Sequence, residues 1–150
     1  MDHNVRRSRG EISELIVEQA LETIRRAKYD IPPIEEIIHS YPNSGLDRRG
    51  IDFLVRFEDG KTIPLQVKSS TRGRRKFESH CRLKGISIPV VIAAPGEQLA
   101  LIINRVIKAI KLVFSIAKRA IDAQVHVTRK LPKRSTKDWC HRYFVPSMCH

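Results

Sequence analysis

The sequence has few of the residues that identify secreted or membrane-spanning proteins. Only three of its 150 residues are cysteine, with no repeated spacing, so a reducing compartment is the simpler interpretation. No segment approaches the ~20 consecutive apolar residues of a membrane-spanning helix. The charged first ten residues also lack the apolar core of a signal peptide. We therefore expect a cytoplasmic protein.

Several short catalytic and ligand-binding motifs are missing as well. The chain has no G-x-x-x-x-G-K-[ST], no G-x-G-x-x-G and no G-x-S-x-G, which disfavours nucleotide hydrolases, dinucleotide enzymes and serine hydrolases. A zinc site usually contains a closely spaced pair such as C-x₂-C, and none is present, so a buried Cys81 and a loose tail are the simpler interpretation. The neighbouring cysteine–histidine pairs are His80-Cys81, Cys140-His141 and Cys149-His150.

Basic residues, in contrast, are in large excess. The chain has 28 Lys and Arg against 16 Asp and Glu, a formal charge of +12, which favours a polyanionic partner, with nucleic acid ahead of an anionic membrane. Residues 11–36 contain seven acidic and three basic residues, whereas residues 68–84 contain seven basic residues and one acidic. This asymmetry suggests carboxylates in a positive field, although a solvated helix beside basic loops would have the same composition.

The length and the 41% apolar content predict one globular core, in a domain of residues 1–124, followed by a basic tail of residues 125–150. Helical spacing predicts a first helix over residues 11–28, ended by Pro32 and Pro33, and a weaker pattern predicts a strand over 34–41. The apolar stripe expected to face the core is Ile12, Leu15, Ile16, Ala20, Ile24 and Ala27.

Two clearer strands follow, over residues 51–57 and 61–69, and their alternation determines the turn between them. A two-residue Asp59-Gly60 turn would place the two apolar sets on opposite faces. A three-residue loop, residues 58–60 with Gly60 left-handed, pairs Phe57 with Lys61 and Asp52 with Gln66, and brings the apolar residues together. The shared apolar face is Phe53, Val55, Phe57, Ile63, Leu65 and Val67.

Beyond Lys68, the sequence predicts a basic loop over 69–76, a short helix over 77–84 and a strand over 86–94 that is buried on both faces. A long helix over 97–122 has a narrow polar stripe and more apolar surface than one sheet contact would bury. A second copy of the chain, forming a homodimer, or the folded-back tail would cover it. The stripe is Asn104, Lys108, Lys111, Ser115, Lys118 and Asp122.

The early acidic helix, then Gly50-Ile51-Asp52, then Gln66-Val67-Lys68 form the most informative arrangement. It resembles the PD-(D/E)xK nuclease superfamily, whose restriction-endonuclease-like core is a helix, a three-strand meander, a helix and a strand. The resemblance covers roughly residues 10–94. Gly10 four residues before Glu14, with the Gly-x-Asp before the hairpin, is similar to Holliday-junction resolvases and Mrr-type enzymes, and Gln66 looks like the QxK variant of the Mrr-type group.

This resemblance implies an α/β fold with a mixed central sheet and a Mg²⁺- or Mn²⁺-dependent endonuclease that cleaves DNA. Hydrolysis of a phosphodiester needs a cation that neutralises phosphate charge and acidifies a bound water. Asp52 would be the principal ligand, Glu14 and the Val67 carbonyl further ligands, and the Gln66 carbonyl a weak one. Lys68 would position the attacking water or stabilise developing charge. Among the other acidic residues, Glu11 or Glu18 could replace Glu14, and Asp47 is a further candidate with a loop-capping role as its simpler interpretation.

No base-reading motif is visible, so we expect recognition of DNA structure or ends. Phosphate contacts are expected from Arg72, Arg74, Arg75, Lys76, Lys108, Lys111 and Lys118. Gln66 in place of an acidic residue supports an alternative, a catalytically inactive DNA-binding module that acts with a partner. Association of the long helix with a membrane surface is a third interpretation and the least economical.

Overall fold

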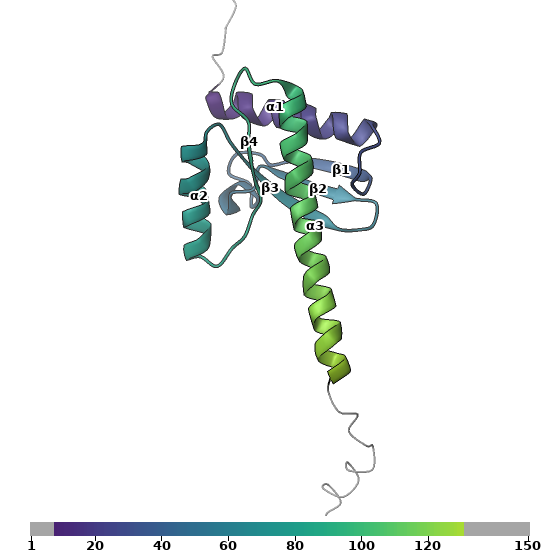
Figure 1. The fold of residues 1–150 in the computed structure, drawn as a ribbon. Coiled ribbons are helices and arrows are strands. Elements are labelled where there is room, and N and C mark those ends of the chain that lie inside the picture. Colours follow the sequence, from purple (N-terminus) through teal and green to yellow (C-terminus); the bar gives the residue numbers. More distant parts are fainter. Residues whose placement is uncertain (1–7, 131–150) are drawn as a thin grey trace, which may run out of the picture. The chain divides into compact units, whose positions relative to one another are not determined.

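The structure, a computed structural model, describes residues 8–130 and shows an α/β fold (Figure 1). The order of helix, three strands, helix, strand and long C-terminal helix is confirmed, and it is consistent with a restriction-endonuclease-like topology. The elements are α1 (Arg9–Arg26), β1 (Ile34–His39), the 3-10 turn η1 (Asp47–Arg49), β2 (Phe53–Phe57), β3 (Thr62–Lys68), α2 (Thr71–Leu83), β4 (Val90–Ile92) and α3 (Leu99–Lys130).

Internal contacts divide the chain between Ser115 and Ile116, so α3 begins in the first unit and continues into the second. The side chains of α3 are described as far as Asp122. No helix within residues 8–130 is long and apolar enough to cross a membrane. Most of the tail expected over residues 125–150 lies outside the described residues.

The sheet is mixed, with strand order β1-β2-β3-β4. β1 and β3 run antiparallel to β2, and β4 runs parallel to β3. The three-residue hairpin loop is confirmed: Phe57 N donates to Lys61 O at 2.9 Å, Gly60 has a φ of 80°, and Phe53 pairs with Leu65. This register follows from burial, because a slip by one residue would turn every apolar side chain to the other face.

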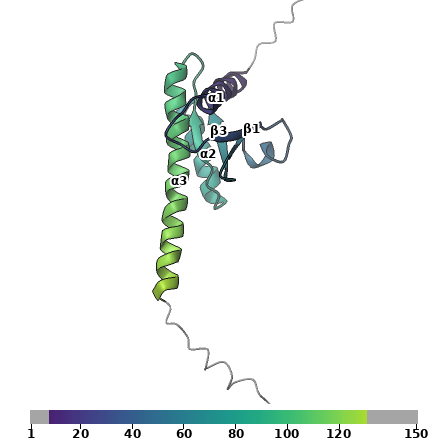
Figure 2. The same ribbon diagram turned by 90° about the vertical axis from the view of Figure 1, so that its right-hand side faces the viewer.

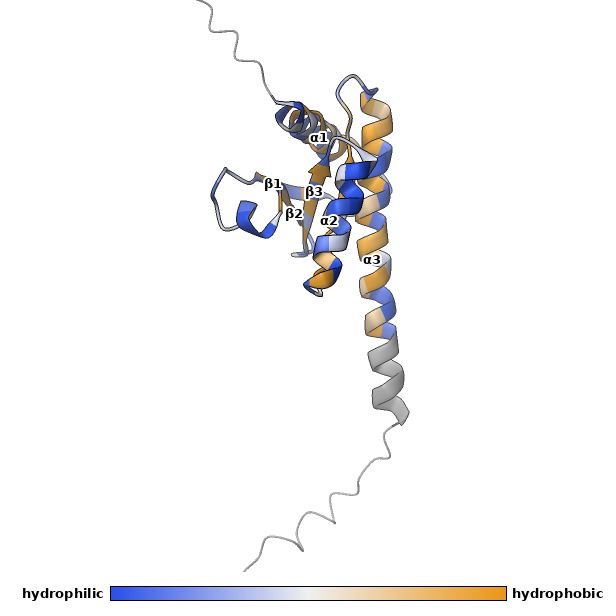
Figure 3. Ribbon diagram, turned by 90° about the vertical axis from the view of Figure 1, so that its left-hand side faces the viewer, coloured by the Kyte–Doolittle hydropathy of each residue, from blue (hydrophilic) through white to orange (hydrophobic). Residues whose placement is uncertain are grey.

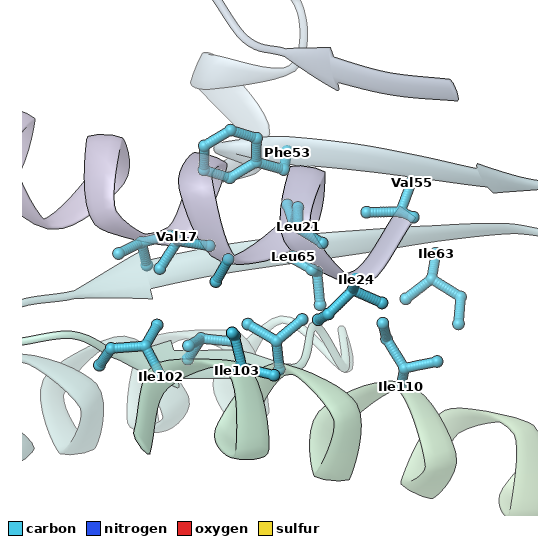
Figure 4. Close-up of a cluster of buried hydrophobic side chains, with 14 of the residues drawn as sticks. Val17, Leu21, Ile24, Phe53, Val55, Ile63, Leu65, Ile102, Ile103 and Ile110 are labelled. Atoms are coloured by element: carbon cyan, nitrogen blue, oxygen red, sulfur yellow. The ribbon is translucent and has the colours of Figure 1, made fainter. Parts of the chain in front are cut away.

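The six apolar residues predicted to share one face of this hairpin are all buried. Helices α1 and α3 supply the other side of the core, with Leu21, Ile102 and Ile110 packed against the strands (Figure 4). η1 lies on the opposite side of the sheet from the first part of α3 (Figure 2). The core therefore occupies one face of the sheet, and η1 lies on the other side.

The predicted stripe of α1 is only partly correct. Ala20 and Ile24 are buried, but Ala27 is exposed, and the buried face also contains Ser13, Val17 and Leu21. Ser13 is tolerated inside because its hydroxyl donates to the Arg9 carbonyl at 2.8 Å, four residues earlier in the helix. The buried face of α1 is therefore centred about one residue later in the sequence than the predicted apolar stripe.

The expectation of a basic loop over residues 69–76 is wrong, because α2 already begins at Thr71. The Ser70 hydroxyl caps this helix by accepting from Gly73 N at 3.2 Å. One turn later, Arg74 Nε donates to Glu78 Oε1 at 2.6 Å, an i,i+4 pair that supports the helix. The cap and the ion pair outweigh the cluster of like charges that suggested a loop.

The strand expected over residues 86–94 is also shorter than predicted. Only Val90–Ile92 form β4, and among them only Val91 is fully buried, while Ile86 is 48% exposed. Pro89 has no N–H and precedes the paired residues, and residues 84–89 connect α2 to the strand. Burial on both faces was therefore the wrong interpretation of this continuous apolar run.

Candidate active site

The main chain around Asp52 is fixed between two neighbouring strands. Asp52 N donates to Leu65 O at 3.0 Å, and its carbonyl accepts from Ser40 N at 2.8 Å. β3 extends beyond the start of β2, so the N–H of Val67 has no partner on that strand. Asp52 Oδ2 takes this N–H at 2.6 Å. The hairpin register thus determines where this carboxylate lies.

Gln66 is 3% exposed and fills the space beside the carboxylate. Its Nε2 donates to Asp52 Oδ2 at 2.5 Å and to the Val67 carbonyl at 3.2 Å. The side-chain nitrogen of Gln66 therefore faces Asp52. The side-chain oxygen, which was expected there as a weak metal ligand, points elsewhere. Gln66 Oε1 is buried, and no group within residues 8–130 donates a hydrogen bond to it. An orphaned buried oxygen of this kind is costly unless a proton donor or a cation reaches it.

Burial raises the pKa of the Asp52 carboxyl above its ordinary value, and the like charge of Glu14 raises it further. The hydrogen bonds from Val67 and Gln66 and the charge of Lys68 oppose this rise without cancelling it. An ionised Asp52 is therefore unfavourable by itself. A cation beside it would lower the free energy of the ionised form.

Lys68 leaves β3 on the side of the sheet that carries Gln66. Its Nζ lies 5.2 Å from the ring centre of Phe77 on α2, close enough for a cation–π interaction. The same ring lies against η1, since a Cβ added at Gly50 would meet a Phe77 ring carbon at 2.7 Å. Phe77 therefore lies between the Lys68 ammonium and the turn before Asp52, a position that the sequence pattern did not indicate.

Glu14 is the acidic residue of α1 that acts on Asp52. Its neighbours have other partners: Glu11 forms a capping box with Ser8, and Glu18 Oε1 lies 4.0 Å from His39 Nδ1. Asp47 has the expected capping role, because its Oδ2 accepts from Asn43 N at 2.8 Å. These contacts distinguish candidates that helical spacing alone left open.

His39 was not identified from the sequence, yet it contacts the candidate site. Its Nε2 lies 3.2 Å from Glu14 Oε2, and its ring stacks on Phe53 with centres 4.5 Å apart. His39 and Phe53 are cross-strand partners in the sheet. The only sequence signal was a histidine near the end of a weakly patterned strand, which is why periodicity did not reveal it.

The donors fit a hard divalent cation. Two carboxylates, those of Asp52 and Glu14, come with the main-chain oxygen of Val67, a set that suits Mg²⁺ with several retained waters, whereas the Gln66 oxygen lies toward Gly50. Among residues 8–130, no group of three or more His, Cys, Asp or Glu side chains could hold a metal ion, so a cation at this site would depend on two carboxylates and a main-chain oxygen. Cys81 is buried, whereas the other two cysteines lie outside the described residues.

The predicted phosphate-contacting residues lie on two helices. Arg72, Arg74, Arg75 and Lys76 are exposed on the first turns of α2, the hydrophilic part of that helix (Figure 3). Lys108, Lys111 and Lys118 are exposed on α3, where Lys111 Nζ pairs with Asp30 at 2.6 Å. α2 starts three residues after Lys68, so its basic turns lie next to the candidate site in the chain.

Comparison of the chain with models of protein families, with curated proteins and with solved structures gives no match.

Proposed function

We propose that this protein is a metal-dependent endonuclease of the PD-(D/E)xK type that hydrolyses DNA phosphodiester bonds and recognises DNA structure or ends more than base sequence. The observation that carries the proposal is the half-buried Asp52 carboxylate. Two N–H groups hold it in place, burial raises its pKa, and the charges of Glu14 and Lys68 act on it in opposite directions. Such perturbed groups cluster at functional sites.

Each residue has a defined part in this proposal. Asp52 and Glu14, with the Val67 carbonyl, would hold Mg²⁺ or Mn²⁺. When bound, the cation neutralises phosphate charge and acidifies a water molecule. Lys68 orients the attacking water or stabilises negative charge that develops on the phosphate. Gln66 keeps the Asp52 carboxylate in its orientation, and the Phe77 ring keeps the Lys68 ammonium near it.

Phosphates on either side of the scissile bond are expected to contact the exposed basic residues of α2. Their charges confer affinity that falls with salt and carries little sequence information. The apolar residues of the predicted helix 97–122 favour a homodimer, which would allow cuts in both strands. Both partners, DNA and a second copy, belong to this proposal.

The second candidate is a DNA-binding module without catalysis, acting with a partner protein. One observation favours it: Gln66 Nε2 donates a hydrogen bond to Asp52 Oδ2, so position 66 supplies a neutral amide in place of a second carboxylate beside Asp52. A neutral donor in this position weakens the negative field that attracts a divalent cation. The two candidates differ in cleavage and agree on DNA binding.

Cleavage by the wild type, Asp52→Ala and Glu58→Ala distinguishes them. Each is incubated with supercoiled, linear or branched DNA in Mg²⁺, Mn²⁺ or EDTA, and the products are separated on a gel. Glu58 is an exposed acidic residue of the hairpin loop, so its variant controls for the loss of one negative charge. We expect metal-dependent cutting by the wild type and Glu58→Ala and none by Asp52→Ala.

DNA affinity of Asp52→Ala should be equal to or greater than that of the wild type, because a negative charge near phosphate is removed. If all three proteins shift DNA mobility and none cuts, the binding module is correct. If none binds DNA, both candidates are wrong.

A further inference from the structure

The edge of β4 is open. Pro89 O accepts from Gln66 N, and Ala93 N donates to Lys68 O, so both of these residues turn their main-chain groups toward β3. These groups alternate in direction along a strand, so those of Val90 and Ile92 point away from the sheet. Among residues 8–130, no hydrogen bond satisfies the Val90 N–H and C=O or the Ile92 N–H.

An ion pair closes the far end of this edge. Arg105 Nη1 donates to the Ile92 carbonyl at 2.8 Å, and Glu97 Oε2 accepts from Ala94 N at 2.7 Å. Arg105 and Glu97 also bind each other through two contacts of 2.8 Å. This arrangement covers the edge beyond Ile92 and leaves the stretch from Val90 to the Ile92 N–H open.

A groove of about 790 Å³ lies beside the open stretch, between α2, the loop before β4 and α3. Its walls are apolar at Ile86, Ile88 and Leu112, with Ile86 48% and Leu112 59% exposed. Its cations are Arg74, Arg82, Arg105 and Lys108, and its one acidic residue is Glu78. Within the described part of the chain, Arg82 and Lys108 form no ion pair.

From this edge and groove we infer that the protein binds an extended, acidic peptide segment of a partner protein, which adds to the sheet as a fifth strand beside β4. The open N–H and C=O groups of Val90 and the Ile92 N–H pair with the main chain of the segment. Apolar side chains at alternate positions contact Ile86 and Leu112. Acidic side chains reach Arg82 and Lys108 at the rim.

A peptide satisfies this groove better than a nucleic acid does. A phosphodiester backbone has no N–H donor for the Val90 carbonyl, and the apolar walls offer nothing to phosphate. A strand supplies donors and acceptors in alternation and lies about 4.8 Å from its neighbour. An unpaired strand edge promotes unwanted association, so folded proteins usually cover it. An edge left open in the described residues is therefore expected to be covered by a partner. The groove shares Arg74 and Lys108 with the predicted phosphate-contacting residues, but none of the proposed metal ligands lines it, so the inference does not depend on nuclease activity.

The test uses the ¹⁵N-labelled full-length protein and a short acetylated, amidated peptide of alternating glutamate and valine. There are two control peptides. In the first, lysine replaces every glutamate. The second keeps glutamate but carries N-methyl groups on the main-chain nitrogens along one edge of the strand. We expect the glutamate peptide to shift the amide resonances of Val90 and Ile92 in a saturable way. The lysine and N-methyl peptides should bind at least about tenfold more weakly, which corresponds to the loss of one charged or two neutral contacts.

Two variants identify the surface. Val90→Pro removes the N–H that faces away from β3 and leaves the hydrogen bonds that Pro89 and Ala93 make to β3, so peptide binding should weaken while the fold is kept. Arg82→Glu reverses a charge on the groove wall, and Arg72→Glu is its control on the same helix outside the groove. We expect about tenfold weaker binding for Arg82→Glu and no change for Arg72→Glu.

Three outcomes would overturn the inference. The first is the absence of shifts at Val90 and Ile92 at millimolar peptide. In the second, a DNA oligonucleotide shifts those amides and the peptide does not, which would assign the groove to nucleic acid. In the third, the same shifts grow with protein concentration alone, which would assign it to a second copy of the chain.

Discussion

Asp52 links the candidate chemistry to folding stability. Because burial raises the pKa of its carboxyl in the folded state, the folded protein binds this proton more tightly than the unfolded chain does. Ionisation therefore costs stability, and the contribution of Asp52 falls as pH rises from about 4, near the unfolded pKa, through the raised folded pKa. Below that window the carboxyl is neutral in both states and has no effect.

We predict that Asp52→Asn is more stable than the wild type at neutral pH in EDTA, and that the difference disappears toward pH 4. Asparagine keeps an oxygen for the Val67 N–H while removing the charge. The measurement is the free energy of unfolding in urea across this range, with Glu58→Gln as a control. Added Mg²⁺ should raise the melting temperature of the wild type more than that of Asp52→Asn. Parallel pH profiles would contradict a raised pKa.

His39 gives a second prediction at this scale, which rests on the proposed function. Removal of its ring in His39→Ala frees the Glu14 carboxylate, so the Mg²⁺ concentration for half-maximal cleavage should rise about tenfold. His39→Gln keeps a hydrogen-bonding group and should recover part of the loss. Mn²⁺ affinity, measured by calorimetry without DNA, should weaken in parallel. An unchanged metal requirement in His39→Ala would leave His39 with packing on Phe53 as its only role.

Residue types and spacing predicted Asp52, Gln66 and Lys68 as neighbours, because a period of two and one turn register determine which side chains share a face. The same reasoning left Glu11, Glu14 and Glu18 as alternatives, because residues one turn apart on a helix share a face. The direction of the Gln66 amide and the contact of His39 with Glu14 depend on tertiary packing, which leaves no periodic signal.

Among the elements, two left-handed glycines allow a matched comparison. Gly60 in the hairpin loop has a φ of 80° and open space around it, whereas Gly50 has a φ of 71° and faces Phe77. Gly60→Ala should cost about 1 kcal/mol, from backbone strain alone. Gly50→Ala should cost more, because a Cβ there would meet the Phe77 ring at 2.7 Å.

The displaced ring should also move away from Lys68, so cleavage should fall in Gly50→Ala and not in Gly60→Ala. Urea unfolding gives the stability of each variant, and the gel assay gives cleavage at a temperature where both are folded. Equal losses of stability in the two variants would show that the Phe77 side chain can move away from a Cβ at position 50 without a cost in free energy.

The elements differ in how well the sequence predicts them. The hairpin was predicted with its register because alternation and a glycine turn agree. The helix predicted over 77–84 was too short, because the first turns of α2 are basic and their signal is a single serine cap. β4 was predicted too long, because a continuous apolar run does not reveal where pairing ends. The local sequence pattern thus predicted the pairing within the hairpin. It failed at the ends of helices and strands, which depend on capping residues and on neighbouring elements.

At the scale of the whole molecule, α3 has more apolar surface than the contacts of the described residues bury. Ile102, Val106 and Ile110 are packed in the core, whereas Leu101 is 48% exposed and Ile116 and Ile121 are each 57% exposed. Large apolar residues grouped on an exposed helix are typical of association surfaces. The expectation of a homodimer through residues 97–122 follows from this surplus.

We predict that the wild type is a dimer at micromolar concentration and that Ile116→Lys combined with Ile121→Lys makes it a monomer. Lysine in place of these isoleucines keeps helix propensity and adds charge where apolar contact is needed, so folding should be unaffected. Asn104→Lys, an exposed change on the polar stripe of the same helix, should remain a dimer. Light scattering after size exclusion gives the mass of each protein. A wild type that stays monomeric across the concentration range would contradict the dimer and leave any double-strand cleavage to successive single cuts, since one chain holds one candidate site.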